Sequence, residues 1–352
     1  MAILAFEKRL EPTFAGGAIA VAAAIGLSLV ATSLLLWSAG ASPLQALISI
    51  YVGAFGNQMA IVTTLLRASP LILTGVAVTV AFRAKIWNIG AEGQLYAGAM
   101  AGYAAYLVCM GLPTFILLPI VLLSGFAGGA CLGALAGYLK ARFSVNEVLS
   151  TVMLNYVVRF GLSYLLVNNW RDMTSFYQQS ERVSASAMLP ALIPGTKLHL
   201  GFLIALICAV AVHVLLSRTA LGYEIKAVGQ NPVASRFKGI NVGRTAVTVM
   251  LISGGLAGLA GVAEVFGTQL RLRPDISVGY GFAGIVIAML AGLRPLLVVP
   301  VAILFAALST GGVTMQIDTG VPSALTLVVQ AIVLIFFLIT TALARYQIKI
   351  GG

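Results

Sequence analysis

Residues 199–217, HLGFLIALICAVAVHVLLS, lie between Lys197 and Arg218 and contain no charged side chain. About 20 such residues in an α-helix span the hydrocarbon core of a bilayer. The whole 352-residue chain has a similar composition, because 60% of its residues are hydrophobic and 9% are charged, against about 25% charged in typical soluble domains. The sequence therefore predicts an all-α membrane protein with many spans and excludes an ordinary soluble protein.

Apolar runs bounded by charged residues predict about ten transmembrane helices. These runs cover residues 15–38, 61–82, 94–112, 114–138, 148–167, 199–217, 245–265, 281–293, 295–312 and 321–344. The apolar segment Leu44–Phe55 is too short to cross comfortably, so we expect it at the membrane interface. No Pro-rich or Ser-rich linker divides the chain, so we expect a single transmembrane domain over residues 1–352.

The positions of the Lys and Arg residues predict the orientation of these helices. With the N-terminus inside, 14 of the 21 Lys and Arg residues lie in cytoplasmic segments, five lie outside, and Arg67 and Arg159 lie within spans. Because basic residues collect in cytoplasmic loops, this bias predicts that both termini are cytoplasmic. The two longest loops, Asn168–Leu198 and Arg218–Arg244, then face outward and inward respectively. The +11 net charge has the same explanation, so we expect no nucleic-acid partner.

Two glycine-rich polar stretches interrupt the apolar pattern. Asn88–Gly98 (NIGAEGQLYAG) follows one predicted span, and Ser277–Gly284 (SVGYGFAG) follows another. In the expected orientation the first break faces the cytoplasm and the second faces outward, which is the arrangement of inverted repeats in transporters. Two unrelated glycine-rich helix starts are the alternative interpretation.

Asn88, Glu92 and Gln94 lie among the glycines of the first break. A carboxylate beside hydrocarbon is costly and tends to face a cavity or a partner, so these residues predict a pathway or gating element. The alternative is a capped helix start, with Asn88 as N-cap and Glu92 near the positive helix end. Asn155, in the predicted span 148–167, is a further candidate for the pathway, although such polar residues more often bridge helices.

The loop Arg218–Arg244 contains signals for two short helices. Residues 220–228 can form the first, which Gly229 would end in a left-handed cap. Asn231 and Pro232 supply an N-cap and a first-turn proline for the second. Val233 and Phe237 lie on one side of this second helix, and Gly239 ends it. Such a cationic, amphipathic pair predicts a docking surface, with a helix resting on the anionic inner leaflet as the alternative.

Motifs for covalent chemistry are missing from the sequence, so we expect no catalytic residues, cofactor or metal site. There is no Walker A sequence, no HExxH and no recognisable nucleophile–His–acid set. The three cysteines lie inside apolar runs without ligand-like spacing. Glycines at every fourth position, Gly125, Gly129, Gly133 and Gly137 as well as Gly254 and Gly258, instead predict seams of close helix packing.

The stretch Ala81–Gln94 (AFRAKIWNIGAEGQ) resembles the signature of permease subunits of bacterial ATP-binding-cassette (ABC) importers, in the branch that handles nucleosides and simple sugars. Three further stretches are similar to the same family in the same order: Val145–Tyr156, Gly222–Asn241 and Gly279–Ile285. The similarity extends roughly from Leu65 to Leu343. Ala283 departs from the family pattern, in which a polar residue often follows the position of Phe282.

The resemblance implies that this chain forms the substrate pathway and leaves ATP hydrolysis to a separate ATPase subunit. It also implies a related second permease, a periplasmic or lipid-anchored substrate-binding protein, and a bacterial inner (plasma) membrane with its lipids as surroundings. Coupling to the ATPase is assigned to Glu224, Gly229, Asn231, Pro232, Val233, Arg236, Phe237 and Gly239. The substrate pathway is assigned to Asn88, Glu92, Gln94, Asn155 and Phe282.

Nucleosides are the substrate class that the resemblance favours, with simple sugars as the alternative. A secondary transporter powered by an ion gradient is a third hypothesis. It is the weakest of the three, because only Glu92 and Glu264 place carboxylates near the membrane.

Overall fold

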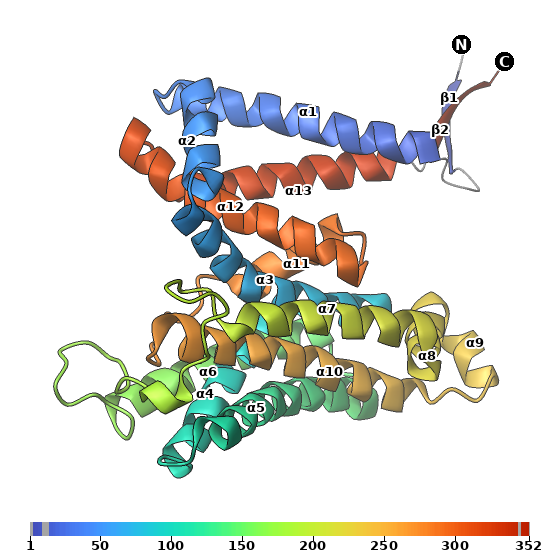
Figure 1. The fold of residues 1–352 in the computed structure, drawn as a ribbon. Helices are drawn as coiled ribbons and strands as arrows, with labels where there is room; N and C mark the ends of the chain where they lie inside the picture. The colour runs from blue at the N-terminus through green and yellow to red at the C-terminus, as the bar shows by residue number, and fades with distance from the viewer. Residues whose placement is uncertain (1–2, 9–13, 344–345, 352) are drawn as a thin grey trace. The chain divides into compact units, whose positions relative to one another are not determined.

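The computed structural model describes residues 3–8, 14–343 and 346–351. The regular secondary structure of the described residues is helical apart from two short strands, β1 (Ile3–Lys8) and β2 (Tyr346–Gly351). The helices are α1 (Phe14–Ser38), α2 (Pro43–Phe55), α3 (Gln58–Arg83), α4 (Ala91–Val108), α5 (Thr114–Phe143), α6 (Glu147–Val167), η1 (Ala185–Ala187), α7 (Leu200–Arg218), α8 (Ala220–Gln230), α9 (Pro232–Phe237), α10 (Val242–Ala263), the π-helix η2 (Glu264–Gln269), α11 (Tyr280–Leu290), α12 (Pro295–Thr319) and α13 (Leu325–Leu343). The predicted all-α class is confirmed (Figure 1).

Among the described residues, six helices are long and apolar enough to cross a membrane: α3, α5, α6, α7, α10 continued by η2, and α12. A bent pair formed by Ala22–Ser38 and α2, at 108°, would be a seventh span. The chain is therefore a multi-pass membrane protein. Each of the ten predicted spans coincides with a helix, but α4, α11 and α13 do not reach these limits, so the count of ten stays a prediction.

The chain divides into two compact units. The first, unit one, comprises residues 1–61 and 307–352, and unit two comprises residues 62–306. In unit one, α1 packs along α13, and β1 pairs antiparallel with β2 so that Ile3 lies opposite Gly351. The Ser49 hydroxyl of α2 donates to the Asp318 carboxylate of α12 at 2.6 Å. The expected single domain over residues 1–352 stays a prediction.

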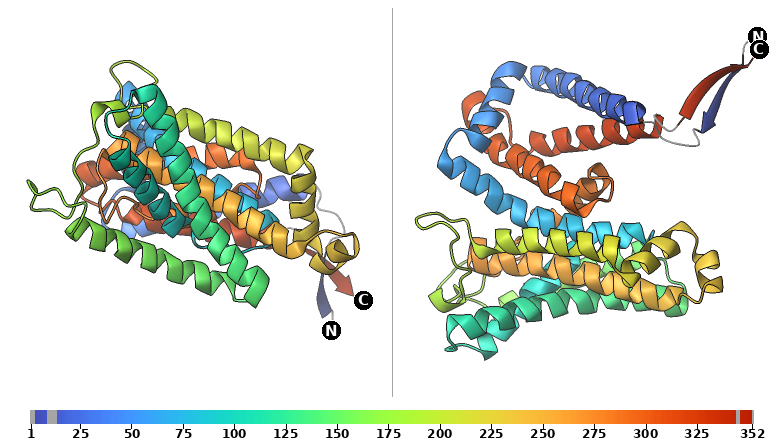
Figure 2. Two further views of the ribbon diagram at one scale, coloured as in Figure 1. Left: turned by 90° about the horizontal axis from the view of Figure 1, so that it is seen from below. Right: turned by 45° about the vertical axis from the view of Figure 1, so that its right-hand side comes forward.

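Unit two is built around a glycine seam between α5 and α10. A Cβ atom on Gly258 would collide with the carbonyl of Gly125, and one on Gly254 would collide with the carbonyl of Gly129. Small residues let helix backbones approach closely, which is the main source of packing attraction in lipid. The predicted packing seam is therefore confirmed, and Figure 2 shows α5 and α10 running along each other.

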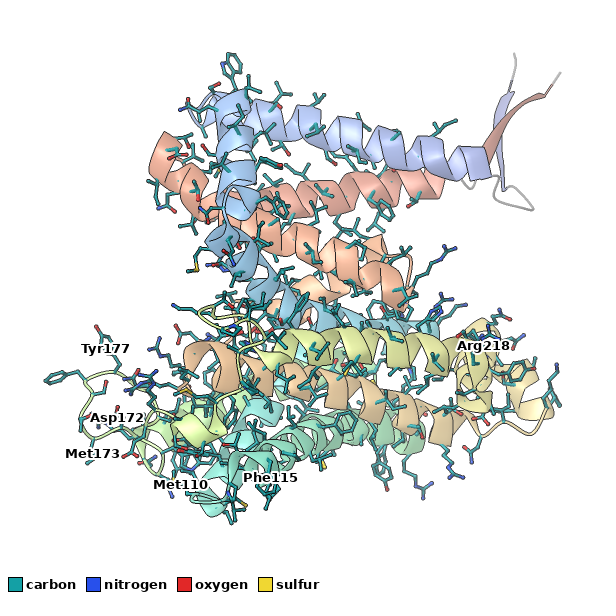
Figure 3. All side chains as sticks on the ribbon, viewed as in Figure 1. Met110, Phe115, Asp172, Met173, Tyr177 and Arg218 are labelled. Carbon is teal, nitrogen blue, oxygen red and sulfur yellow. The ribbon has the colours of Figure 1, made fainter. Side chains whose placement is uncertain are left out.

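The two ends of unit two carry different elements. Figure 3 places Arg218, which precedes α8 and α9, at one end, and Met173 and Tyr177 of the loop 168–199 at the other. The continuous helix Val242–Gln269 runs between these ends: its first residue follows α9, and near its last turn the Phe266 carbonyl accepts from the Leu189 N–H of that loop at 2.9 Å. The position of a residue along this helix therefore shows how far it lies from either end of unit two.

Candidate functional site

The first glycine-rich break lies deep inside unit two. The chain leaves α3 at Arg83 and runs without helix until α4 begins at Ala91. On the way, the Asn88 amide donates to the Ser253 hydroxyl at 2.9 Å. Ser253 is the twelfth of the 28 residues of Val242–Gln269, so α4 starts about midway between the two ends. Non-helical backbone at such depth is tolerated only where protein or a water-filled cavity surrounds it.

Asn88 and Gln94 hold this break together. The Asn88 amide donates to Gln94 Oε1 at 2.9 Å, and the Gln94 amide donates back to Asn88 Oδ1 at 3.1 Å. Asn88 Oδ1 also accepts from the Gly90 N–H at 2.9 Å. Both side chains are buried, and buried polar networks rigidify a core when every member is bonded. The N-cap residue of α4 is Gly90, so Asn88 is not the N-cap that the alternative made it, although Glu92 does lie in the first turn of this helix.

Asn155 of α6 completes the same network. Its Oδ1 accepts from the Gly93 N–H at 2.8 Å, and its amide donates to the Ile89 carbonyl at 3.0 Å. A Cβ atom on Gly93 would collide with Asn155, so glycine is needed for α4 to come this close. Asn155 thus bridges α6 to the break, which is the commoner of the two roles considered for it.

The second glycine-rich break meets the first. The Glu92 carboxylate accepts from the Gly281 N–H at 2.7 Å, in the first turn of α11. Gly279, with φ 91°, turns the chain into this helix, and a Cβ atom on Gly281 would collide with the backbone of Glu92. A carboxylate at a helix N-terminus also complements the helix dipole. The two breaks therefore meet at one depth inside unit two, and their expected orientation toward opposite sides of the membrane stays a prediction.

The helix α11 spans only part of unit two. At its far end, the Arg83 guanidinium donates to the Leu293 carbonyl at 2.8 Å, so α11 runs from the break to the end of α3. Its 11 residues are about 16 Å long, roughly half of the hydrocarbon core. Phe282, on this helix, has an exposed side chain, unlike the four other residues assigned to the pathway.

The helix α8 is packed firmly within unit two. The Thr219 hydroxyl accepts from the Gly222 N–H at 3.1 Å and caps its start, while Ile225 is buried in the core. Gly229 does not end this helix as predicted, because α8 continues to Gln230. A Cβ atom on Gly229 would instead collide with the Arg83 carbonyl, so this glycine allows close contact with the end of α3.

Glu224 ties α8 to α10. The Thr245 hydroxyl donates to the Glu224 carboxylate at 3.4 Å. Both residues border a hollow of ≈ 570 Å³, which is also lined by Lys238 and Arg244. Glu224 therefore both contacts another helix of the chain and lines this surface hollow.

The helix α9 is presented to the surface. Asn231 Oδ1 accepts from the N–H groups of Val233 and Ala234, both at 3.0 Å, and Pro232 opens the helix. Gly239, with φ 81°, follows its end. This capping pattern is as predicted. The side chain of Phe237 is 89% exposed, and Arg236 is exposed beside it. An exposed apolar residue among cations suits a binding surface.

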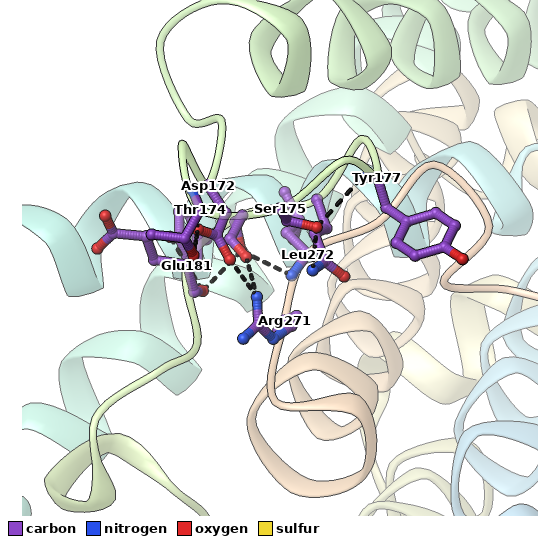
Figure 4. Close-up of polar contacts among 10 residues, drawn as sticks. Asp172, Thr174, Ser175, Tyr177, Glu181, Arg271 and Leu272 are labelled. Carbon is purple, nitrogen blue, oxygen red and sulfur yellow. Dashed lines mark hydrogen bonds and ion pairs between the residues drawn. The ribbon is translucent and has the colours of Figure 1, made fainter.

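The loop 168–199 contains a polar contact that the sequence pattern did not reveal. Arg271 forms an ion pair with Asp172, and the Thr174 hydroxyl donates to the same carboxylate at 2.6 Å (Figure 4). These donors, the Thr174 hydroxyl first, hold the pKa of Asp172 below its ordinary value. The Ser180 N–H donates to the Leu272 carbonyl at 2.9 Å. The loop is therefore joined to residues 270–272 by charge and by backbone hydrogen bonds.

Among the described residues, no group of three or more His, Cys, Asp or Glu side chains is placed to hold a metal ion. The residues that converge are instead amides, one carboxylate and backbone groups at a helix break. That arrangement can position helices and accept hydrogen bonds.

The chain is similar to a known family of transport proteins. Residues 60–338 match the family described as branched-chain amino acid transport system / permease component. A guanosine ABC transporter permease protein of Bacillus subtilis is 36% identical over 317 residues, which cover 89% of this chain and 90% of the relative.

Two further relatives match a comparable share of this chain. A glucose ABC transporter permease protein of Haloferax volcanii is 35% identical, over 88% of this chain and 84% of the relative. A nucleoside ABC transporter permease protein of Lactococcus lactis is 33% identical, over 84% of each chain. With its apolar helices and its match over residues 60–338, this chain belongs to the ABC transporter permease family described as branched-chain amino acid transport system / permease component.

Proposed function

We propose that this permease forms the substrate pathway of an ATP-driven nucleoside importer and receives its driving force through α8 and α9. The observation that carries the proposal is the exposed Phe237 on a short, doubly capped helix next to the firmly packed α8. A separate ATPase subunit that binds Phe237, Val233 and Arg236 would move α9 and α8 together as a rigid unit. The chain itself has no phosphate-binding loop, so ATP hydrolysis belongs to that partner.

A continuous chain of contacts supports this coupling. Movement of α8 would act on the end of α3, because Gly229 lies directly against the Arg83 backbone. The Arg83 guanidinium in turn donates to the carbonyl of Leu293, which lies three residues after the end of α11. At its other end α11 rests on Glu92. We propose that displacement of α8 tilts α11 and so opens or closes the pathway at the break.

Nucleosides are the proposed substrates, because relatives named for guanosine and for nucleosides are 36% and 33% identical over most of this chain. Simple sugars are the second candidate, because a permease named for glucose is 35% identical. The proposed partners are the ATPase, a related second permease, a periplasmic or lipid-anchored binding protein and the surrounding lipids. We place the chain in the bacterial inner membrane with ten spans and both termini in the cytoplasm.

The contact between the two breaks is also compatible with an inverted repeat. Elements related by a two-fold axis in the membrane plane meet near mid-depth in many transporters, and Glu92 meets Gly281 there. We therefore retain the inverted repeat as part of the proposal.

Transport by the reconstituted complex tests the proposed function. Proteoliposomes that contain this permease with its co-purified ATPase, second permease and binding protein should accumulate radiolabelled guanosine only when ATP hydrolysis is possible. An uncoupler should leave this uptake unchanged. Accumulation of glucose instead of guanosine would favour the second candidate, and uphill uptake by this chain alone would contradict the ABC mechanism.

A further inference from the structure

Arg159 carries a charge on the exposed side of a membrane-spanning helix. It is the thirteenth of the 21 residues of α6, and its side chain is exposed. Its Cα therefore lies about 18 Å from the start of the helix and about 12 Å from its end. A cation at such depth is expensive when it faces lipid, so it faces the protein interior or water in almost every known case.

The described part of the chain offers no ion-pair partner for this guanidinium. The ion pairs seen there join Lys140 to Glu147 and Arg271 to Asp172. Arg159 follows Asn155 by four residues, so it lies on the same side of α6 as Asn155. Asn155, one helical turn earlier, is already bonded to the break itself. Arg159 therefore extends the polar flank of α6 beyond the network and out to the surface.

A separate, apolar strip runs along the other exposed side of α6. Leu149, Met153, Val157, Phe160 and Tyr164 have exposed side chains there. These residues suit lipid or an apolar partner surface, because they are hydrophobic along the full length of the helix. The polar flank with Arg159 and the apolar strip thus face two different surroundings.

We propose that the flank of α6 at Arg159 faces an aqueous pathway, and that Arg159 determines specificity there by favouring solutes with exposed oxygen acceptors and repelling cations. The inference rests on the proposed function, since it assumes that the chain lines a transport route. A guanidinium has five N–H donors and no acceptor. The carbonyl and hydroxyl oxygens of nucleosides and of sugars match it, while cationic solutes are disfavoured by its charge.

Cysteine accessibility tests whether Arg159 meets water. In the assembled transporter, with Cys109, Cys131 and Cys208 replaced by alanine, Arg159→Cys and Val157→Cys are treated with a charged, membrane-impermeant thiol reagent. Val157 is the matched control, because it lies two residues away on the apolar strip. Arg159→Cys should react at least about tenfold faster, and saturating guanosine with binding protein should slow its reaction. Equal reaction rates at the two positions would overturn the proposal.

Uptake by substituted transporters tests the role of the charge. Arg159→Leu should insert normally but import guanosine about tenfold more slowly, while Arg159→Lys should retain most of the activity because it keeps a cationic donor. Wild-type uptake by Arg159→Leu, with an increased yield of protein, would show a lipid-facing side chain and overturn the proposal. Labelling of Arg159→Cys in a complex that imports only sugar would leave this inference intact while the nucleoside assignment failed.

Discussion

The Glu92 carboxylate accepts a hydrogen bond at 2.7 Å from the backbone N–H of Gly281, which lies 189 residues further along the chain. This bond joins the first turn of α4 to the first turn of α11 in the interior of unit two. It requires glycine at position 281, where any side chain would collide with the Glu92 backbone. Two helix starts that are remote in sequence therefore form a single junction.

Glu92→Ala should loosen this junction and impair transport. The Gly281 N–H would lose its acceptor in a buried position, which costs about 1–3 kcal/mol. We expect a lower thermal unfolding midpoint in detergent and reduced guanosine uptake, with ATPase association unchanged. Glu92→Gln keeps an acceptor oxygen and should retain more stability than alanine. Wild-type uptake kinetics in Glu92→Ala would remove this residue from the transport mechanism.

Phe237→Asp should abolish ATPase association and uptake while leaving membrane insertion intact. The side chain is 89% exposed on α9, so aspartate removes apolar contact area from the proposed interface without disturbing a core. Phe176→Asp is the control, because Phe176 is also a fully exposed phenylalanine and lies on the loop 168–199 at the other end of unit two. Co-purification of the ATPase measures the effect, and normal assembly with Phe237→Asp would refute the docking assignment.

Gly258→Ala should destabilise the α5–α10 seam. The added Cβ would collide with the Gly125 carbonyl, and such overpacking costs about 1–3 kcal/mol. Gly161→Ala on α6 is the matched control, because a Cβ there has no neighbour within 4 Å. Since alanine favours a helix over glycine by roughly 0.5–1 kcal/mol, the control should be neutral or slightly stabilising. The thermal unfolding midpoint should fall for Gly258→Ala, whereas it should stay unchanged or rise slightly for Gly161→Ala.

The loop 168–199 should loosen in acid. Hydrogen bonds from Thr174 and Arg271 lower the pKa of Asp172 in the folded protein. The stabilisation is therefore complete above the ordinary aspartate value of about 3.9 and is lost as the pH falls through the lower folded-state pKa. Hydrogen exchange at the Ser180 and Val183 amides, corrected for the intrinsic pH dependence, should show this loss of protection.

Asp172→Asn is the control for that measurement. Its neutral side chain cannot form the ion pair with Arg271, so protection of the loop amides should be lower at neutral pH and should no longer change with acid. Equal pH dependence in the variant and the parent protein would assign the transition to another group.

The short helices α8 and α9 show how far local sequence signals extend. Asn231, Pro232 and Gly239 define α9 correctly, because caps and turns depend on neighbouring backbone groups. Gly229 carried the same kind of signal, yet α8 continues through it. Glycine is needed at position 229 because the helix contacts the Arg83 backbone there. This contact comes from another part of the chain, so the residues around Gly229 do not reveal it.

The apolar runs and the spacing of the glycines by themselves determined that the chain is helical, where its helices lie and which faces pack in seams, because these properties follow from residues a few positions apart. Only the tertiary structure decided the depth of the break at Asn88, its bond to Ser253 and the meeting of Glu92 with Gly281. The partner of a buried polar group is chosen by which helices pack together. Here those helices are up to 189 residues apart in the chain.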